Sequence, residues 1–246
     1  MLGFRSWKSM GLVFVLGLLL VLGFFSSIYA AGKSKTSKRK FRLTAKSALA
    51  LNLDKDEVLF EKNSDEVRSI ASLTKLMSAM VFLESGVNLF ETETITRKDA
   101  YLSAQSSLRI GEKFYLIDLL YVSLMSSDNR AIRALVRATG MSEDEFVQKM
   151  NRKADSLGLW NTRFVDPTGL KMDNLSTARE CAKLLSLALS DPLIARITTT
   201  QEYKFFSLNK RWRIHQATNS NRLLKSDIEI LGGKTGFIAR SGWCIA

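Results

Sequence analysis

Residues 70–85 read IASLTKLMSAMVFLES, in which the polar quartet SLTK opens a run whose apolar residues recur at helical spacing. A helix that begins at Ser72 places Ser72 and Lys75 three residues apart on one face, where their side-chain tips can meet. A serine hydroxyl is a poor nucleophile until a base takes its proton, and a lysine becomes such a base when burial lowers its pKa. The quartet therefore predicts an activated serine, with Lys75 as its base. The alternative is a helix cap followed by a solvated lysine, because S-x-x-K also occurs at residues 37–40 and 207–210.

A second polar motif, SSDN at residues 126–129, falls at the joint between two runs of helical pattern. A break of this kind inside an apolar block exposes polar side chains. Ser127 is placed to pass a proton between Lys75 and a leaving group, and Asn129 to orient Lys75 and a substrate amide. Ordinary loop capping is the alternative, because S-x-N also occurs at residues 207–209.

A third motif, Lys234-Thr235-Gly236, lies in a strand-like run and is the only K-[ST]-G in the chain. A fixed cation and a hydroxyl at a strand edge can hold a substrate carboxylate, and glycine lets a ligand approach the backbone closely. A strand followed by a bend is the alternative. The three motifs together are harder to attribute to chance than any one of them.

The order of periodic segments indicates an α+β fold. Residues 45–53 and 57–62 are β-prone runs joined by turn formers, and most of residues 91–189 show helical spacing. From residue 202 the period returns towards two, as in EYKFFSL and in IEILGGKTGFIA at 228–239. Strands at both ends predict an antiparallel sheet built from the two ends and flanked by helices, with an inserted helical lobe and a cleft between them.

The N-terminal region predicts export. The chain has 246 residues and a net charge of +12, but residues 1–42 hold eight basic and no acidic residues, which leaves 28 basic against 24 acidic side chains in the rest. A nucleic-acid-binding protein would carry its basic surface on the folded body, so this class is disfavoured. We assign residues 1–31 as a signal peptide or signal anchor, with possible membrane association through residues 10–30, and residues 32–44 as a basic linker.

Few residues are suited to metal or disulfide chemistry. Cys181 and Cys244 could pair or remain two buried thiols, and the spacing leaves both options open. His215 is the only histidine, so a Ser-His-Asp enzyme and a histidine-rich metal site are both disfavoured. We expect no cofactor and no metal.

With its three motifs in this order, the chain resembles the low-molecular-mass penicillin-binding proteins, the active-site serine D-alanyl-D-alanine peptidases. The resemblance covers residues 45–246 and extends to the stretches LMSSDNRA, NTRFVDPTGL, NLSTARE and TNSNRLL. It implies the fold shared by these peptidases and the serine β-lactamases. It also implies a catalytic set of Ser72, Lys75 and Ser127, and a substrate-binding set of Asn129, Lys234, Thr235, Gly236 and Phe237. Within these sets, the N–H groups of Ser72 and Phe237 are expected to form the oxyanion hole.

The resemblance is greatest to the endopeptidase branch, which opens peptidoglycan cross-links through an acyl-enzyme on Ser72. The alternatives are a carboxypeptidase that trims terminal D-alanine and a non-catalytic wall-binding relative. A class A β-lactamase also carries S-D-N, but the E-x-x-L-N pattern of its deacylating glutamate does not follow Asn129. Peptidoglycan peptides are the expected partners, β-lactams the expected covalent inhibitors, and the periplasm or the outer face of the cytoplasmic membrane the expected location. Family members continue beyond K-T-G through two more strands and a helix, so we expect the domain at 45–246 to be C-terminally incomplete.

Overall fold

The computed structural model describes residues 43–101, 103, 106–210 and 213–246. Contacts divide the chain into two units, residues 1–44 and residues 45–246, and the second is described below. The predicted signal segment at 1–31 lies outside the described residues, as does most of the predicted linker. Within the described part of the chain, no helix is both long enough and apolar enough to cross a membrane.

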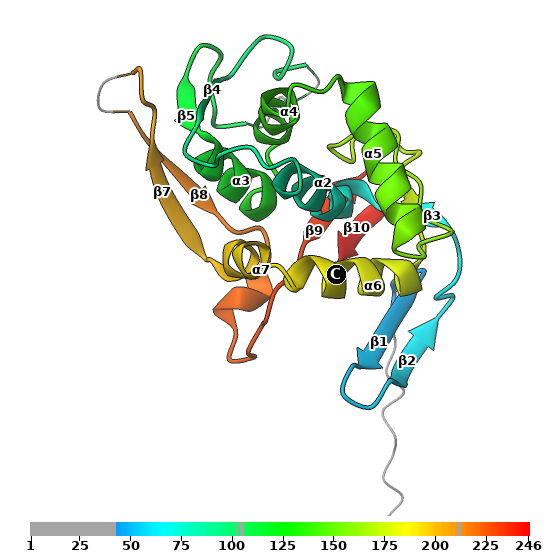
Figure 1. Cartoon of the computed structure of the whole chain (residues 1–246). Helices are drawn as coiled ribbons and strands as arrows, with labels where there is room; N and C mark the ends of the chain where they lie inside the picture. Colours follow the sequence, from blue (N-terminus) through cyan, green and yellow to red (C-terminus); the bar gives the residue numbers. More distant parts are fainter. Residues whose placement is uncertain (1–42, 102, 104–105, 211–212) are drawn as a thin grey trace, which may run out of the picture. The chain divides into compact units, whose positions relative to one another are not determined.

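Helices and short antiparallel strands alternate along the second unit (Figure 1). In chain order the elements are β1 (Ala48–Asn52), β2 (Glu57–Lys62), β3 (Arg68–Ser69), the 3₁₀ turn η1 (Ala71–Leu73), α2 (Thr74–Leu83), β4 (Thr92–Thr94), β5 (Lys113–Tyr115), α3 (Leu116–Met125), α4 (Asn129–Ala138), α5 (Glu143–Ser156), β6 (Leu175–Ser176), α6 (Ala178–Leu189), α7 (Pro192–Thr199), β7 (Glu202–Phe206), β8 (Ile214–Thr218), the 3₁₀ turn η2 (Arg222–Lys225), β9 (Thr235–Ile238) and β10 (Gly242–Ile245).

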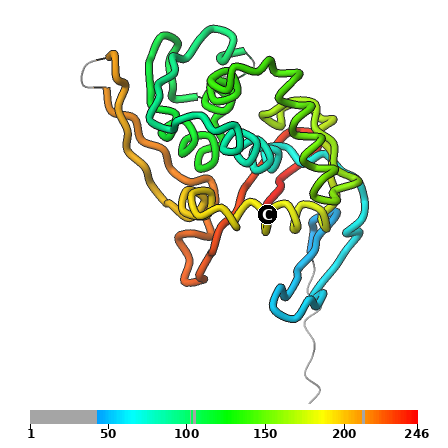
Figure 2. Tube along the Cα trace, viewed as in Figure 1, coloured from blue at the N-terminus to red at the C-terminus, as the bar shows by residue number. Residues whose placement is uncertain are grey.

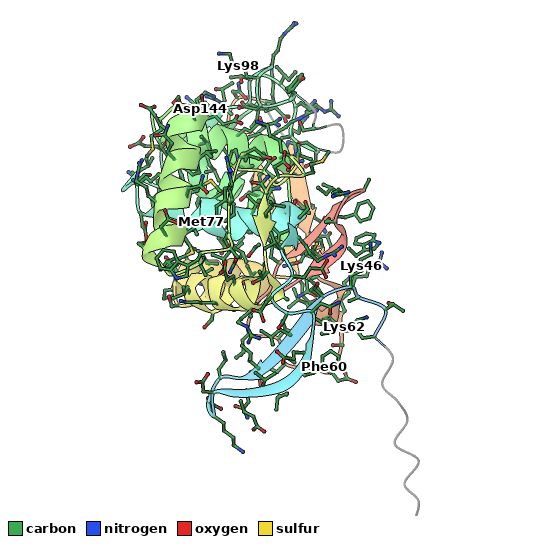
Figure 3. The ribbon with its side chains drawn as sticks, turned by 90° about the vertical axis from the view of Figure 1, so that its right-hand side faces the viewer. Lys46, Phe60, Lys62, Met77, Lys98 and Asp144 are labelled. Carbon is green, nitrogen blue, oxygen red and sulfur yellow. The ribbon has the colours of Figure 1, made fainter. Side chains whose placement is uncertain are left out.

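Helix α2 forms the centre of the core. All of its residues except Met80 and Leu83 are buried, and it packs against α3, α4, α5 and α6 (Figure 1). A helix with so few polar residues must be enclosed in this way, because no continuous face of it is polar. Met77, labelled in Figure 3, is one of its fully buried side chains. The central position of α2 fixes the place of Ser72 and Lys75 relative to every surrounding helix.

The start of α2 differs from the sequence-based prediction. The α-helix begins at Thr74, and Ser72 lies in the preceding 3₁₀ turn η1. Ala71 adopts a φ of 49°, in the left-handed region that residues other than glycine rarely occupy. Turn η1 packs against β9 and β10, so distant segments hold the nucleophile segment in this conformation (Figure 2).

The helix boundaries follow their capping residues. Ser142 and Glu145 form a reciprocal capping box at the start of α5, and Thr177 caps α6 through the Glu180 N–H. Helix α3 begins at Leu116, because the residues before it form strand β5 and pair with β4. Helix α7, capped by Asp191, was not part of the prediction.

The α+β class is confirmed, but the strands are arranged as separate pairs. Among the described residues the ladders are β1–β2, β3–β6, β4–β5, β7–β8 and β9–β10, all antiparallel. The terminal pairs β1–β2 and β9–β10 therefore share no ladder in the described chain, contrary to the single sheet predicted from the two ends. The pattern at 228–234 produces no strand, and regular pairing in β9 begins at Thr235. The predicted C-terminal incompleteness stays a prediction.

Among the described residues, the side-chain hydrogen bonds of Ser72 and Lys75 involve neither the two cysteines nor the histidine. Cys181 and Cys244 both carry free thiols. Burial raises the pKa of the Cys181 thiol to about 12, so it is unreactive as a nucleophile at neutral pH. His215 is buried in β8, where its Nε2 lies 3.3 Å from the Glu112 carboxylate and its ring stacks on Phe205.

Candidate active site

Ser72 and Lys75 are in direct contact at the start of α2. Lys75 Nζ lies 3.0 Å from Ser72 Oγ, the separation of a hydrogen bond. The 3₁₀ turn and the first turn of the α-helix together place the two side chains three residues apart on one face. Lys75 is completely buried, whereas Ser72 is only half-buried and remains within reach of a ligand. The pair has the geometry of a nucleophile and its base.

The other contacts of Lys75 determine where its lone pair points. Its Nζ donates to Asn129 Oδ1 at 2.7 Å and to the Thr168 carbonyl oxygen at 2.5 Å. A carbonyl oxygen accepts hydrogen bonds but cannot donate them. When Lys75 is neutral, these two acceptors take its two hydrogens, and the remaining lone pair faces Ser72 Oγ. The surrounding groups thus preorganise the neutral amine to accept the serine proton.

The electrostatic environment brings Lys75 into the range where it can act as a base. Burial lowers the pKa of Lys75 from 10.5 to about 7, while the negative charges of Asp166 and Asp128 oppose that shift and Arg133 adds to it. A substantial neutral fraction is therefore present near neutral pH. The best general base has a pKa close to the working pH, which this environment provides.

The Thr168 carbonyl is held in place by a turn that the sequence analysis did not assign to the site. The Asp166 carboxylate accepts hydrogen bonds from the N–H groups of Thr168, Gly169 and Lys171 at 2.6, 2.8 and 2.7 Å. Burial opposes the charge of Asp166, but these and other donors outweigh burial and keep the pKa of the carboxyl below its usual value. Asp166 is thus a charged anchor for the 166–171 turn.

Three side chains of the SSDN motif have different positions at the start of α4. Asp128 caps α4 by accepting from the N–H groups of Arg130 and Ala131, which makes Asn129 the first residue of the helix. Ser127 adopts a φ of 62°, and its Oγ is buried without a hydrogen-bond partner in the described structure. A strained backbone and an unpaired buried hydroxyl together cost stability, so such a residue is a candidate for contact with a ligand.

Lys234 provides a second buried cation. It is completely buried, and its Nζ donates to the Thr235 carbonyl oxygen at 2.8 Å. Burial and the nearby charge of Lys75 lower its pKa well below the usual lysine value. In the described part of the chain no carboxylate forms an ion pair with Lys234, so an anionic ligand placed beside it would favour its charged form.

Along β9, the backbone N–H and C=O groups of alternate residues point towards β10 or away from it. Lys234 exchanges two backbone hydrogen bonds with Ala246, and the Cα register continues with Gly236 opposite Cys244 and Phe237 opposite Trp243. Because hydrogen-bonded and non-hydrogen-bonded pairs alternate in an antiparallel ladder, the N–H of Phe237 points away from β10. This is the geometry that an oxyanion-hole donor at Phe237 requires.

Gly236 lies directly against the nucleophile segment. A Cβ atom on Gly236 would lie 2.8 Å from the Ser72 backbone nitrogen, closer than Cβ atoms in proteins approach a non-bonded atom. The absence of a side chain lets β9 pass beside Ser72, which supports the sequence-based reason for a glycine here.

Ser220 adds a polar contact that the sequence analysis missed. Its Oγ lies 2.5 Å from Thr235 Oγ1 and 3.0 Å from the Met125 carbonyl oxygen. Its backbone N–H donates to the same Met125 carbonyl at 2.9 Å. Ser220 thus joins the K-T-G strand to the end of α3, immediately before the SSDN motif.

A family model described as D-alanyl-D-alanine carboxypeptidase matches residues 33–246. The chain belongs to the D-alanyl-D-alanine carboxypeptidase family. It is 34% identical over 239 residues to a D-alanyl-D-alanine endopeptidase of Escherichia coli, an alignment that covers 95% of this chain and 76% of that protein. A D-alanyl-D-alanine endopeptidase of Pseudomonas aeruginosa is 36% identical over 206 residues, covering 82% of this chain and 66% of that protein. The crystal structure of the Streptomyces K15 DD-transpeptidase matches with a TM-score of 0.75 at 30% identity, covering 82% of this chain and 84% of that one.

Membership of the D-alanyl-D-alanine carboxypeptidase family confirms the predicted resemblance and the predicted DD-peptidase fold. The structure brings Ser72, Lys75 and Asn129 into direct contact, and it places Gly236 against the same segment. The prediction did not identify Asp166, Thr168 or Ser220 as site residues. Their signals were the stretches FVDPTGL and TNSNRLL, which the sequence analysis used only to support the resemblance.

Proposed function

We propose that the chain is a serine-type D-alanyl-D-alanine endopeptidase that opens peptidoglycan cross-links through an acyl-enzyme on Ser72. The observation that carries this proposal is the Lys75 amine, which is buried, hydrogen-bonded to two acceptors and directed at Ser72 Oγ. The names of the relatives from E. coli and P. aeruginosa support the endopeptidase activity. Lys75 would be the base, and the K-T-G strand would bind the substrate carboxylate.

In the acylation step, Ser72 Oγ attacks the carbonyl carbon of the penultimate D-alanine while Lys75 Nζ takes the hydroxyl proton. The carbonyl oxygen becomes an oxyanion, which the N–H groups of Ser72 and Phe237 would stabilise. The C–N bond then breaks, and the leaving amine receives a proton. Ser127 is suited to deliver that proton from Lys75, because its buried Oγ has no hydrogen-bond partner among the described residues and is free for this role.

Deacylation returns the enzyme to its starting state. A water molecule attacks the ester carbonyl, Lys75 takes the water proton, and Ser72 Oγ leaves as the alcohol after receiving a proton. The free carboxylate of the peptide is the product. The same lysine serves both half-reactions, since it is neutral again once the amine has taken the first proton.

Substrate recognition would occur at the K-T-G strand. Lys234 and Thr235 are proposed to hold the carboxylate next to the scissile bond, which in a cross-link belongs to the acceptor residue. An anion there would favour charged Lys234, and charged Lys234 in turn would favour neutral Lys75, because two like charges in one buried site repel each other. Substrate binding would thus prepare the base.

We further propose that the enzyme is exported and acts on the outer side of the cytoplasmic membrane. Residues 1–31 contain basic residues first, then a long uncharged run, and then small residues, and this order supports export. Residues 10–30 would provide any membrane association. The β-lactams are the proposed covalent inhibitors, because they present an acyl group with an adjacent carboxylate to the same atoms.

Two measurements test the proposal. Labelled benzylpenicillin should add one acyl group to the chain, and Ser72→Ala should abolish the adduct seen by intact-protein mass spectrometry. Purified cross-linked dimers should be converted to monomers faster than free D-alanine is released from pentapeptides. An adduct on the Ser72→Ala protein would refute the nucleophile. Trimming of pentapeptides without cleavage of dimers would assign the carboxypeptidase activity instead, and the absence of any adduct would favour a non-catalytic relative.

A further inference from the structure

A cavity of about 600 Å³ includes Thr168, a contact residue of Lys75, in its lining. It opens to the surface and is lined by α4, the 166–171 turn, the loop around residues 98–101 and the first turn of α5. Figure 3 shows Lys98 and Asp144, which belongs to that first turn, at the same end of the unit. A volume of this size accommodates a small peptide segment.

The cavity shares two elements with the catalytic site. Thr168, in the 166–171 turn, is one of the residues that line the cavity. Its carbonyl oxygen accepts a hydrogen bond from Lys75. Arg133 lies four residues after Asn129, so the two residues lie on one face of α4, Asn129 at Lys75 and Arg133 at the cavity. The positive charge of Arg133 also contributes to lowering the pKa of Lys75.

Four basic and three acidic side chains line the cavity, and of the basic ones only Arg137 forms an ion pair in the described structure. Lys98, Arg133 and Lys171 all line it, and none of them forms an ion pair in the described structure. Arg133 donates to the carbonyl oxygens of Asp99 and Tyr101, which fixes its guanidinium while leaving its charge uncompensated.

The acidic side chains around the cavity are mostly committed elsewhere. The Asp99 carboxylate pairs with Arg137 at 2.8 Å, and Asp166 is the anchor of the turn described above. Glu143 is exposed on the first turn of α5 and is the one remaining carboxylate among the lining residues. Four basic against three acidic side chains leave the lining with a net charge of +1, and Lys98, Arg133 and Lys171 are its cations without an ion pair in the described structure.

We propose that this cavity binds the acyl-donor peptide upstream of its D-alanine, and that Lys98, Arg133 and Lys171 recognise a free carboxylate on that peptide. This inference rests on the proposed function. If Asn129 takes the amide of the acyl group, the donor peptide continues along the same face of α4 towards Arg133. The guanidinium can receive a carboxylate through a fork of two hydrogen bonds, and the two lysines add charge at the rim. The lining residues Tyr101, Val136 and Leu170 suit the aliphatic part of the peptide.

The test compares two cross-linked peptide dimers that differ in one group. In one dimer the donor stem keeps its free carboxylate upstream of D-alanine, and in the other that carboxylate is an amide. The full chain should cleave the free acid with a kcat/KM roughly tenfold or more above that of the amide, the effect expected of charge-assisted hydrogen bonds.

The variant Lys98→Gln/Lys171→Gln should lose most of this preference, with kcat/KM for the amide unchanged. Both lysine side chains are exposed, and Lys171 supports the turn through its backbone N–H, so the variant should fold normally. Lys204→Gln, an exposed substitution on β7, is the matched control and should keep the preference. Arg133→Lys keeps the charge without the fork and should retain part of the preference.

Equal cleavage of both dimers by the full chain would overturn the inference, as would full preference in the double-glutamine variant. Labelled penicillin separates these outcomes from a failure of the proposed function. A chain that forms the Ser72 adduct and cleaves both dimers equally is an endopeptidase without the proposed carboxylate subsite, whereas a chain that forms no adduct is not an active-site serine peptidase.

Discussion

The Oγ of Ser220 lies 2.5 Å from the Oγ1 of Thr235, and this contact controls which way the threonine hydroxyl can point. Each hydroxyl has one hydrogen. When Ser220 donates to the Met125 carbonyl, Thr235 must donate to Ser220. To give its hydrogen to a substrate carboxylate, Thr235 must instead receive one from Ser220. The Met125 carbonyl stays paired in that state, because the Ser220 backbone N–H also donates to it at 2.9 Å.

Ser220→Ala should therefore lower kcat/KM for carboxylate substrates by about tenfold, the loss expected from one charge-assisted hydrogen bond. Ser220→Thr keeps the hydroxyl and should restore most of the activity. The stability should change little, because Ser220 is exposed. Steady-state kinetics on cross-linked dimers, with a thermal melt of each variant, gives both quantities. If the alanine variant matches the parent, Thr235 acts without Ser220.

The pKa of Lys75 predicts the pH dependence of acylation. Lys75 must be neutral to take the Ser72 proton, and its pKa is lowered to about 7, chiefly by burial. The acylation rate should rise with pH below about 7 and level off above it. Asn129→Asp would place a negative charge 2.7 Å from Lys75 Nζ and favour the charged amine. The rise of the acylation rate should therefore move to higher pH. Penicillin acylation measured from about pH 5 to about pH 9 tests both statements. A flat profile for the parent chain would exclude Lys75 as the titrating base.

Asp166→Asn should reduce stability and shift the pH profile in the opposite direction. The substitution keeps the size but removes the charge that accepts from the turn N–H groups, at a cost of roughly 1.5–3 kcal/mol in the free energy of unfolding. Since the Asp166 charge raises the pKa of Lys75, its removal should move the rise of the acylation rate to lower pH. Asp173→Asn, an exposed acid in the same loop, is the matched control and should change neither property. Denaturant unfolding and the pH dependence of acylation should be measured for the parent chain and both variants. If Asp166→Asn behaves as Asp173→Asn does, this role of Asp166 is contradicted.

How far the sequence predicts this site depends on the range of each interaction. Ser72 and Lys75 are three residues apart, and the capping box of Ser142 and Glu145 is equally local, so their patterns could be read directly. The acceptor at Thr168 is separated from Lys75 by 93 positions and is a backbone carbonyl, which any residue type supplies. No pattern of side chains predicts such a contact before the chain is folded.

The displaced start of α2 has a similar explanation. Local propensity favours a helix from Ser72, but the backbone of β9 and the turn at Gly169 pack against Ala71 and Ser72. A Cβ on Gly169 would lie 2.0 Å from the Ala71 carbonyl oxygen, so these segments touch through backbone atoms. Tertiary contacts therefore override the local preference and leave Ser72 in a 3₁₀ turn. The single predicted sheet failed for a related reason, because strand pairing depends on distant partners that periodicity does not identify.

Gly236→Ala should abolish most of the acylation while leaving the protein folded. The new Cβ would lie 2.8 Å from the Ser72 backbone nitrogen, so β9 or the Ser72 segment must shift, and because the contact is with backbone the shift also costs stability. That nitrogen is a proposed oxyanion-hole donor, and loss of one such donor costs roughly 10²- to 10³-fold in rate. Gly111→Ala is the matched control, because its Cβ would meet open space and only its φ of 85° opposes the substitution. Both variants should lose some stability. The control should keep its acylation rate, whereas Gly236→Ala should bind labelled penicillin far more slowly at a temperature where a thermal melt shows that it is folded. Equal acylation rates for Gly236→Ala and the parent would show that the approach of β9 to Ser72 is unimportant for the oxyanion hole.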